Sequence, residues 1–465
     1  MTPTAQAPGH AVIVGLGRTG LSCARWLTAR GWRVSVTDSR TEPPELPGLR
    51  ALGGDIPLAL GGLDARLLDD ATLVVASPGV ALSETIFDEA RARGLEIVGD
   101  IELFAREVAA PVVGITGTNG KSTVTTLLGR MAERAGIQVR VGGNLGEPAL
   151  DLLAHDAQQP QSPFGVEKTA APRAALYVLE LSSFQLEATE SLALAAATVL
   201  NVTSDHLDRY ASMQEYAAAK ARIFTRCQAA VVNCDDARVV QMRRAGQRTL
   251  GFSLHAGTGA DYVVAERGQP HEHWLMRGEE PLLPVSALRI SGLHNAANAL
   301  AALALGEAID LPMPAMLTEL AAFPGLPHRS QWVADVGGVQ YVDDSKGTNV
   351  GATLAAVAGT AGPLVLIAGG DGKNQDFTPL AAAFRGKVRH VVLIGRDAAA
   401  IAAVLRGVCR TELCATLEEA VRAAARAARP GDTVLLSPAC ASLDMFRDYT
   451  HRGAVFTQAV KELAA

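Results

Sequence analysis

The chain has 465 residues, of which 48% are hydrophobic and 19% are charged, and its formal net charge is -6. This composition predicts a soluble globular protein and excludes a disordered one, and the length predicts about three domains. The acidic balance excludes an electrostatic surface for nucleic acid or anionic lipid, so neither is expected as a partner. The six cysteines contain no CxxC pair, which excludes a structural zinc site or a disulfide framework and favours a reducing cytoplasm.

Two further observations bear on location. No apolar run reaches the length of a membrane span, and the opening residues MTPTAQAPGH lack the charged and apolar regions of a signal peptide. We therefore expect a cytoplasmic protein without a membrane partner.

Short apolar runs alternate with helical patterns along the chain, which is typical of parallel sheets covered by helices. In the first hundred residues, strands are expected at 11–15, 33–38 and 71–80. The turn after the first strand reads GLGRTG, which matches GxGxxG, and Asp38 closes the next strand. The motif predicts either a nicotinamide dinucleotide or another diphosphate held at a helix N-terminus.

A second unit starts with PVVGITGTNGKSTVTT at residues 111–126. The order Gly120-Lys121-Ser122 is that of a phosphate-binding loop, although Gly114 lies one position earlier than the usual first glycine. A strand precedes the motif and a helix is expected from Ser122 to about residue 135. We therefore expect backbone N–H groups and Lys121 to hold phosphates, and Ser122 to ligate Mg²⁺.

The following strands are expected at 175–182, 197–203 and 229–236. Each ends in polar residues, and ligands collect at the carboxyl ends of parallel strands. Four polar residues fall there: Glu180, Asn201, His206 and Asp208. Glu180 is expected either to ligate Mg²⁺ or to cap the next segment, and His206 is either a ligand or a polar loop residue. From its sequence context, Lys220 is an ordinary lysine on a helix surface.

The remaining segments complete the architecture. Residues 158–173 are expected to form a surface loop, residues 249–290 an antiparallel appendage, and residues 323–331 an interdomain joint. A third α/β unit follows. Only seven of the 42 basic residues are lysine, and two of those seven lie in the loops VDDSKGTN and GGDGKN. These loops are either solvated turns or contacts to substrate or nucleotide.

Taken in order, the motifs resemble those of the Mur ligases of peptidoglycan synthesis: GTNGKST, LELSSFQLE, NVTSDHLDRY, GLHNAANALAA, PHRSQ, DDSKGTN and GGDGKN. The likeness covers nearly the whole chain, and it makes the early Gly114 a variant of the family's own loop. Five other stretches are similar to the D-glutamate-adding branch: GLGRTG, TDSR, SPGV, VGDIELF and SPACASLDMF.

The resemblance implies an α/β fold of three domains. A Rossmann-like N-terminal domain at 1–99 would bind the UDP substrate, and a central P-loop ATPase-type parallel sheet at 100–325 would bind ATP. A Rossmann-like C-terminal domain at 326–465 would contact the amino acid and the nucleotide.

The implied activity is an ATP-dependent amide synthesis in the cytoplasmic assembly of peptidoglycan precursors. The carboxylate of UDP-N-acetylmuramoyl-L-alanine attacks the γ phosphate, and the amine of D-glutamate displaces the resulting acyl phosphate, which leaves ADP and phosphate. The resemblance also implies two Mg²⁺ sites, a carbamylated Lys220 in place of the ordinary surface lysine, and a monomer.

Site residues follow by position in the motifs. The catalytic set is Lys121, Glu180, His206 and Lys220, and the metal set is Ser122, Glu180, His206 and Lys220. The ATP set is Gly117, Thr118, Asn119, Gly120, Lys121, Ser122, Thr123, Asn295, Arg329, Asp344 and Lys346. The set for the UDP substrate is Arg18, Thr19, Asp38, Ser39, Arg40, Gly79, Asn144 and His206. The D-glutamate set is Thr348, Lys373, Ser442, Leu443 and Tyr449.

Two residues depart from the family pattern, because Arg18 stands where an apolar residue is expected and Tyr449 where Phe is expected. They leave open how uracil and glutamate pack.

Three alternatives remain open from the residues. A sibling ligase or a folylpolyglutamate synthetase would share the central loop but lack the N-terminal unit. A dehydrogenase would rest on GLGRTG alone. A nucleotide-binding regulator without catalysis would not require Glu180, His206 and Lys220.

Overall fold

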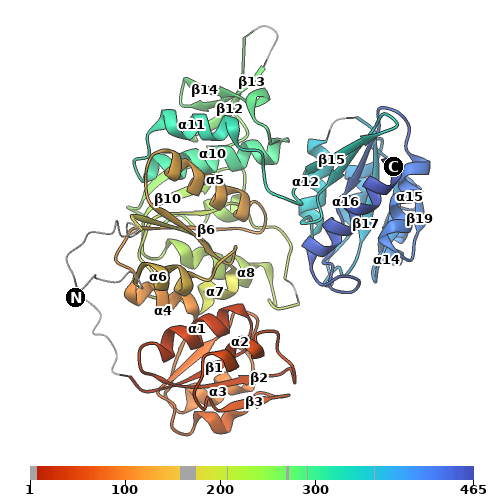
Figure 1. Ribbon diagram of the computed structural model, residues 1–465. Helices are drawn as coiled ribbons and strands as arrows, with labels where there is room; N and C mark the ends of the chain where they lie inside the picture. Colours follow the sequence, from red (N-terminus) through yellow and green to blue (C-terminus); the bar gives the residue numbers. More distant parts are fainter. Residues whose placement is uncertain are drawn as a thin grey trace, which may run out of the picture.

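The computed structural model describes residues 8–157, 174–206, 208–268, 272–290, 292–360 and 362–464. The predicted surface loop 158–173 lies outside these residues. Three sheets follow one another along the chain, and Figure 1 shows them as three bodies, with the C-terminal one beside the central one. The predicted α/β class is confirmed. Within the described ranges, no helix has the length and apolar character needed to cross a bilayer.

The N-terminal sheet is entirely parallel, in the order β3-β2-β1-β4-β5. This is the strand order of the dinucleotide-binding fold without its sixth strand, and ligands in that fold meet the carboxyl ends of the strands. Its central strands are continuous apolar runs because helices cover both faces. The elements are β1 His10–Val14, α1 Arg18–Thr28, β2 Arg33–Asp38, α2 Leu46–Ala51, β3 Leu58–Leu60, η1 Ala65–Leu68, β4 Leu73–Ala76, α3 Thr85–Ala92 and β5 Glu96–Val98.

The central sheet has nine strands in the order β14-β13-β12-β11-β10-β9-β6-β8-β7. They are β6 Val112–Thr116, β7 Val139–Gly143, β8 Leu176–Glu180, β9 Leu194–Val199, β10 Cys227–Asn233, β11 Arg248–Ser253, β12 Tyr262–Arg267, β13 Glu272–Arg277 and β14 Glu280–Pro284. Its helices are α5 Lys121–Arg134, α6 Ala149–Ala157, α7 Ser183–Glu187, α8 Met213–Ala221, η2 Arg222–Phe224, α9 Ala237–Val240, η3 Val285–Ala287, α10 Leu293–Ala308 and α11 Met313–Ala322.

The prediction of an antiparallel appendage at 249–290 is wrong for its first strand and confirmed for the rest. β11 pairs in parallel with β10, and β12 pairs in parallel with β11 at two residues, so both strands extend the main sheet. β12 also pairs antiparallel with β13, and β13 with β14, so these three strands form the antiparallel part. Both parallel strands are partly exposed along their length, which gives them the polar alternation that we took as a sign of antiparallel pairing.

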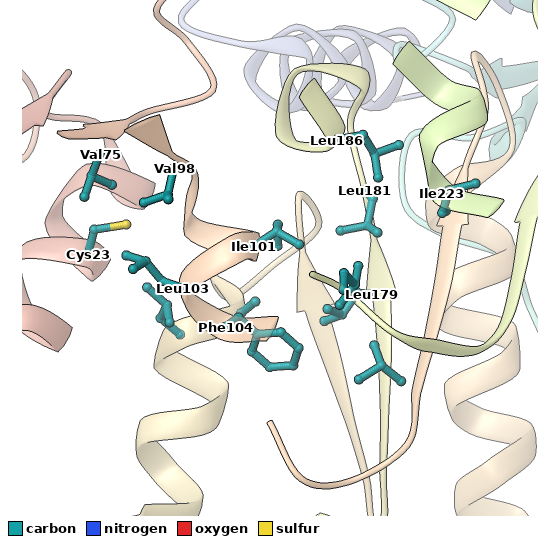
Figure 2. Close-up of a cluster of buried hydrophobic side chains, with 14 of the residues drawn as sticks. Cys23, Val75, Val98, Ile101, Leu103, Phe104, Leu179, Leu181, Leu186 and Ile223 are labelled. Atoms are coloured by element: carbon teal, nitrogen blue, oxygen red, sulfur yellow. The ribbon is translucent and has the colours of Figure 1, made fainter. Parts of the chain in front are cut away.

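The N-terminal and central domains share one hydrophobic cluster. Helix α4, Asp100–Glu107, lies between them, and Figure 2 shows Ile101, Leu103 and Phe104 reaching apolar side chains on both sides. The Phe104 ring also meets the edge of the Tyr177 ring, with centroids 5.2 Å apart. The two domains are therefore joined by a continuous apolar core, because burial of apolar surface stabilises this contact as it does a domain interior.

The C-terminal sheet runs β15-β16-β20-β17-β18-β19, and all its pairs are parallel except β15 with β16. Its elements are β15 Gln331–Val336, β16 Val339–Asp343, α12 Val350–Gly359, β17 Leu364–Gly369, α13 Thr378–Phe384, β18 Val388–Ile394, α14 Ala398–Val404, β19 Arg410–Leu413, α15 Leu417–Ala427, β20 Thr433–Leu436 and α16 Tyr449–Ala464. Two apolar clusters, one on each face of the sheet, fill this domain.

The contact between the central and C-terminal domains is mainly polar. Asn349, at the start of α12, exchanges side-chain hydrogen bonds with Asn119 at 3.2 and 3.3 Å and donates to Asp205 at 3.1 Å. No apolar cluster of the described residues extends across this boundary. The connecting segment 323–331 contains two non-glycine residues with left-handed backbones, His328 and Ser330.

Candidate active site

The phosphate-binding loop runs from residue 117 to residue 120. Gly114 belongs to strand β6 and not to the loop, which corrects its interpretation as a loop variant. It is a packing position, because a Cβ there would meet Leu194 Cδ1 at 2.9 Å. Gly120 precedes α5 with a φ of 86°, and a Cβ there would lie 2.4 Å from Asn298 Oδ1. Glycine is therefore required at position 120 by both backbone and space.

Two lysines point at the same loop. Lys121 Nζ donates to the carbonyls of Gly117 and Thr118, both at 2.9 Å, and Lys220 Nζ donates to Gly117 O at 3.0 Å. Burial, and then the charge of Lys121, lowers the pKa of Lys220 well below its ordinary value. The ordinary-surface reading of Lys220 is therefore wrong, since this side chain is among the largest fully buried ones.

Glu180 ends strand β8 beside the start of α5. Its Oε2 accepts a hydrogen bond from Ser122 Oγ at 2.5 Å, and its Oε1 accepts one from Asn144 Nδ2 at 2.6 Å. Burial alone would raise the pKa of Glu180, but the charge of Lys121 and these two hydrogen bonds lower it. The carboxylate is therefore ionised at neutral pH, although it is only 3% exposed.

The C-terminal domain reaches the same serine through Arg329. Its Nη2 donates to Ser122 Oγ at 2.7 Å, so this hydroxyl lies between a guanidinium and a carboxylate. Arg329 thus links the interdomain segment to the first turn of α5.

A cavity of about 270 Å³ brings the four predicted catalytic residues together. Lys121, Glu180, His206 and Lys220 all line it, and it also holds Asn144, Thr348 and Lys373 from the sets for the two substrates. Burial lowers the pKa of His206, so its imidazole is neutral at pH 7. The cavity can hold a carboxylate or phosphate group against four amines and one guanidinium, beside two carboxylates and one imidazole.

A second cavity of about 150 Å³ lies on the other side of the loop. It contains seven of the eleven residues predicted for ATP: Asn119, Gly120, Thr123, Asn295, Arg329, Asp344 and Lys346. Burial, followed by the charges of Arg329 and Lys121, lowers the pKa of Lys346 to about 8, and burial raises the pKa of Asp344 to about 7. The two cavities share Asn119, Gly120, Arg329 and Lys346, so they flank one loop.

The oxygen donors around the loop fit Mg²⁺. The described residues contain no group of three His, Cys, Asp or Glu side chains able to hold a metal ion by themselves. Ser122 and the ionised Glu180 supply two oxygens within hydrogen-bond distance of each other. Mg²⁺ is usually held by one or two carboxylates, with substrate phosphates and water completing its shell.

The residues predicted for the UDP substrate lie mainly at the carboxyl ends of β1, β2 and β4. Asp38 is 2% exposed and accepts hydrogen bonds from Leu16 N at 2.6 Å and from Arg40 N and Nε at 2.8 Å. Burial would raise the pKa of Asp38, but its bonds with Arg40 lower it to about 2. Asp38 thus fixes the glycine loop and Arg40, while Arg18, Ser39, Arg40 and Gly79 are exposed and Thr19 is half-buried.

Arg18 reaches across to the central domain, where its Nη2 donates to Gly146 O at 2.8 Å. The departure from an apolar residue at this position therefore adds an interdomain contact close to Asn144.

The remaining D-glutamate residues are spread over the C-terminal domain. Ser442 is buried, Leu443 is 70% exposed, and the Tyr449 ring lies 4.0 Å from Lys346 Nζ. None of these three lines either cavity, whereas Thr348 and Lys373 line the larger one.

Sequence reasoning missed several residues that the structure places at the site. Phe184, Asp205 and Asn349 line the larger cavity. Arg209 and Arg452 lie outside it and bind backbone carbonyls of nearby loops, at Val80 and Ser345. Asp205 and Asn349 are direct neighbours of predicted residues, which was an available signal. Arg209 lies in the motif NVTSDHLDRY together with His206, which was also a signal, whereas the pattern around Arg452 contains none.

Comparisons with known proteins agree along the whole chain. The family models described as "Mur ligase MurD-like, N-terminal domain", "Mur ligase middle domain" and "Mur ligase, glutamate ligase domain" match residues 9–99, 115–306 and 328–440. A protein of Nitrosococcus oceani named UDP-N-acetylmuramoylalanine--D-glutamate ligase is 51% identical over 460 residues, covering 98% of both chains. One of the same name from Pseudomonas aeruginosa is 49% identical over 458 residues, covering 97% of this chain and 98% of the other.

Solved structures share the fold at lower identity. The UDP-N-acetylmuramate-alanine ligase MurC of Thermotoga maritima aligns with a TM-score of 0.60 at 18% identity, covering 98% of this chain and 99% of that one. MurF of Acinetobacter baumannii also gives 0.60, at 16% identity, covering 98% and 92%. With three family models matched in order and half of its residues identical to those of full-length relatives, the chain belongs to the Mur ligase family.

Proposed function

We propose that this enzyme joins D-glutamate to UDP-N-acetylmuramoyl-L-alanine in an ATP-dependent reaction of peptidoglycan synthesis. The observation that carries the proposal is the larger cavity, where Lys121, Glu180, His206 and Lys220 meet beside a phosphate loop. The relatives that share half of this chain's residues along its full length bear the name of this ligase.

Phosphoryl transfer needs positioning and charge neutralisation more than covalent help. In the proposed reaction, the substrate carboxylate attacks the γ phosphate of ATP at the loop 117–120. Lys121 turns from the loop carbonyls to the phosphate oxygens and neutralises the charge that develops there. Asn144 and His206 orient the acyl end. The amine of D-glutamate then displaces the phosphate, in a site closed to water by both neighbouring domains.

Bound Mg²⁺ would neutralise phosphate charge. We propose Ser122 and Glu180 as its ligands, with His206 and Lys220 at a second site. A neutral amine can capture CO₂, and the buried Lys220 amine has the lowered pKa that this reaction requires. The carbamate would add an anionic oxygen to those of Glu180 and Asp205, which line the same cavity.

The remaining assignments are also proposals. The smaller cavity supports the ATP set, and the strand ends of the N-terminal sheet support the UDP set. Thr348 and Lys373 support a D-glutamate pocket completed by Ser442, Leu443 and Tyr449. We keep the domain limits 1–99, 100–325 and 326–465, and we propose that the enzyme works in the cytoplasm as a monomer.

The deciding experiment measures phosphate release with ATP, Mg²⁺ and UDP-N-acetylmuramoyl-L-alanine. D-glutamate, L-glutamate, L-alanine and diaminopimelate are supplied in turn. We expect release and a new amide with D-glutamate alone, and no turnover in Lys121→Ala because phosphate stabilisation is lost. Preference for another amino acid would identify a sibling ligase instead. Silence with all four would favour a nucleotide-binding protein without catalysis, and near-normal turnover of Lys121→Ala would contradict the proposed role of that lysine.

A further inference from the structure

A single side chain ties the loop that carries His206 to the N-terminal domain. Arg209 is half-buried, and its Nη1 donates to Pro78 O at 3.2 Å while its Nη2 donates to Val80 O at 2.9 Å. These two carbonyls flank Gly79, which belongs to the proposed UDP set. The guanidinium therefore holds both sides of a segment that meets the sugar nucleotide.

The same guanidinium also contacts a ring that lines the catalytic cavity. Its central carbon lies 4.2 Å from the centroid of the Phe184 ring. Phe184 lines the cavity, and its ring meets the His206 ring edge to face, with centroids 5.0 Å apart. A cation over an aromatic face is attracted by the ring's electrons. Arg209 thus fixes Phe184, and Phe184 in turn limits where the His206 imidazole can lie.

The backbone of His206 needs such support. Its φ of 56° lies in the left-handed region, which residues other than glycine rarely adopt. The amides of Arg209 and Tyr210 both donate to His206 O, at 3.0 and 3.1 Å. A strained backbone persists only where its surroundings hold it, and here one end of the turn is fastened to another domain.

The loop that Arg209 holds is itself fixed to the glycine turn of GLGRTG. Ser77 Oγ donates to Gly15 O at 2.6 Å, and a Cβ on Gly15 would meet Val80 Cγ2 at 2.7 Å. Close contacts therefore run without a break from the turn after β1, through residues 77–80 and Arg209, to Phe184 and His206.

We propose that Arg209 is a positioning residue that sets the spacing between the two ends of the sugar-nucleotide substrate. It holds residues 77–80, at the nucleotide end, at a fixed distance from the His206 imidazole, at the end with the reacting carboxylate. The α4 cluster fixes the two domains through their cores, whereas Arg209 fixes the loops that meet the substrate. The inference rests on the proposed function, which places the nucleotide at one end and the reacting carboxylate at the other.

The test compares wild-type enzyme with Arg209→Met, which keeps the length of the side chain and removes both donors. Calorimetry measures the affinity for UDP and for UDP-N-acetylmuramoyl-L-alanine, and steady-state kinetics measures KM and kcat for each substrate. We expect UDP affinity and the KM for ATP to stay unchanged. We expect kcat/KM for the sugar nucleotide to fall by about tenfold or more, because the loss of charge-assisted hydrogen bonds has an effect of this size. The ratio of the affinity for the whole substrate to the affinity for UDP should fall by the same factor. The values for Arg209→Lys should lie between those of the wild type and Arg209→Met, because an ammonium can donate to one of the two carbonyls.

The matched control is Arg25→Met. Arg25 Nη1 pairs with Asp151 at 2.8 Å and joins α1 to α6 across the same two domains, without touching either cavity. We expect all its constants to match the wild type. Equal effects of the two substitutions, or a parallel loss of affinity for UDP and ATP in Arg209→Met, would overturn the proposal. Absent turnover in the wild type would overturn the proposed function alone, since the affinity ratio between UDP and the whole substrate still tests Arg209.

Discussion

At the scale of single residues, the site depends on how burial changes charge. Lys121 and Lys220 both donate to Gly117 O, and burial lowers the pKa of each. Lys121 adjoins the ionised Glu180, whereas the charge of Lys121 further disfavours a proton on Lys220. We therefore expect the two lysines that contact this loop, one from α5 and one from α8, to serve different purposes: Lys121 as a cation for phosphate and Lys220 as a nucleophilic amine.

This difference leads to a prediction for Lys220→Ala. The substitution removes the proposed carbamate oxygen and should reduce turnover strongly. Because the vacated volume can admit a small anion, formate or acetate should restore part of the activity, as measured by phosphate release. Lys387→Ala is the control, since Lys387 lies outside both cavities and its side chain donates to Ala358 O at 3.1 Å. Failure of every short carboxylate to rescue the variant would argue against a carbamate.

The residues that could be predicted from sequence are those with a local signal. Glu180 follows an apolar strand, and Lys121 follows a glycine, so their positions follow from chain direction and strand order. The burial of Lys220 could not be read from its helix, because EYAAAKARIF shows no clear difference between an inner and an outer face. Its surroundings come from residues about one hundred positions earlier, such as Gly117.

At the scale of elements, two loops of the C-terminal domain, those that contain Ser345 and Cys440, are held together by the first turn of α16. Arg452 is fully buried, and it donates to Ser345 O at 2.7 Å, Ser345 Oγ at 3.0 Å and Cys440 O at 3.1 Å. Ser345 Oγ in turn donates to Tyr449 O at 2.8 Å. Burial lowers the pKa of Arg452 to about 10, so the side chain stays charged at neutral pH.

Arg452→Met should therefore affect one substrate more than another. Buried carbonyls would lose their donors, at a cost of about 2–5 kcal/mol in the free energy of unfolding. The KM for D-glutamate should rise by about tenfold, because four of its five proposed contacts lie on or beside these two loops, while the KM for the sugar nucleotide should not change. Thermal unfolding and steady-state kinetics measure these effects.

Arg389→Met is the matched control for Arg452→Met. Arg389 belongs to the same domain, its side chain is 35% exposed, and it pairs with Asp432 at 3.2 Å. Its loss should cost less than about 1 kcal/mol and leave every KM unchanged. A rise in KM for the sugar nucleotide as large as that for D-glutamate in Arg452→Met would contradict the assignment of these loops.

Prediction of the elements themselves succeeded where the hydrophobic pattern was strong. The buried strands β1, β6 and β8 are continuous apolar runs and were located within a few residues. β11 was assigned the wrong direction, because direction depends on the partner strand and not on the pattern of the strand itself.

At the scale of the whole molecule, the two joints between domains differ in kind. The N-terminal domain shares an apolar core with the central one through α4, and the C-terminal domain meets it mainly through Asn119, Asn349, Asp205 and Arg329 (Figure 1). Polar contacts can exchange partners at small cost, because water and substrate offer equivalent ones. Motion during turnover should therefore occur at the segment 323–331.

Spin labels can test this expectation. One pair joins Arg50 on α2 to Arg238 on α9, and the other joins Arg238 to Glu418 on α15, all exposed positions. A background without the partly exposed cysteines keeps the labelling specific. Addition of an ATP analogue and the sugar nucleotide should shift the second distance and leave the first unchanged. Equal shifts in both pairs would show that the N-terminal domain moves as well.

The apolar contact at α4 also makes the link between the N-terminal and central domains sensitive to temperature. Apolar attraction weakens on cooling, whereas hydrogen bonds between asparagines and a guanidinium do not depend on it. On cooling, the apolar contact at α4 would therefore weaken before the polar contact between the central and C-terminal domains. An enzyme of this design that adapts to low temperature would therefore be expected to change residues of α4 before those of the segment 323–331.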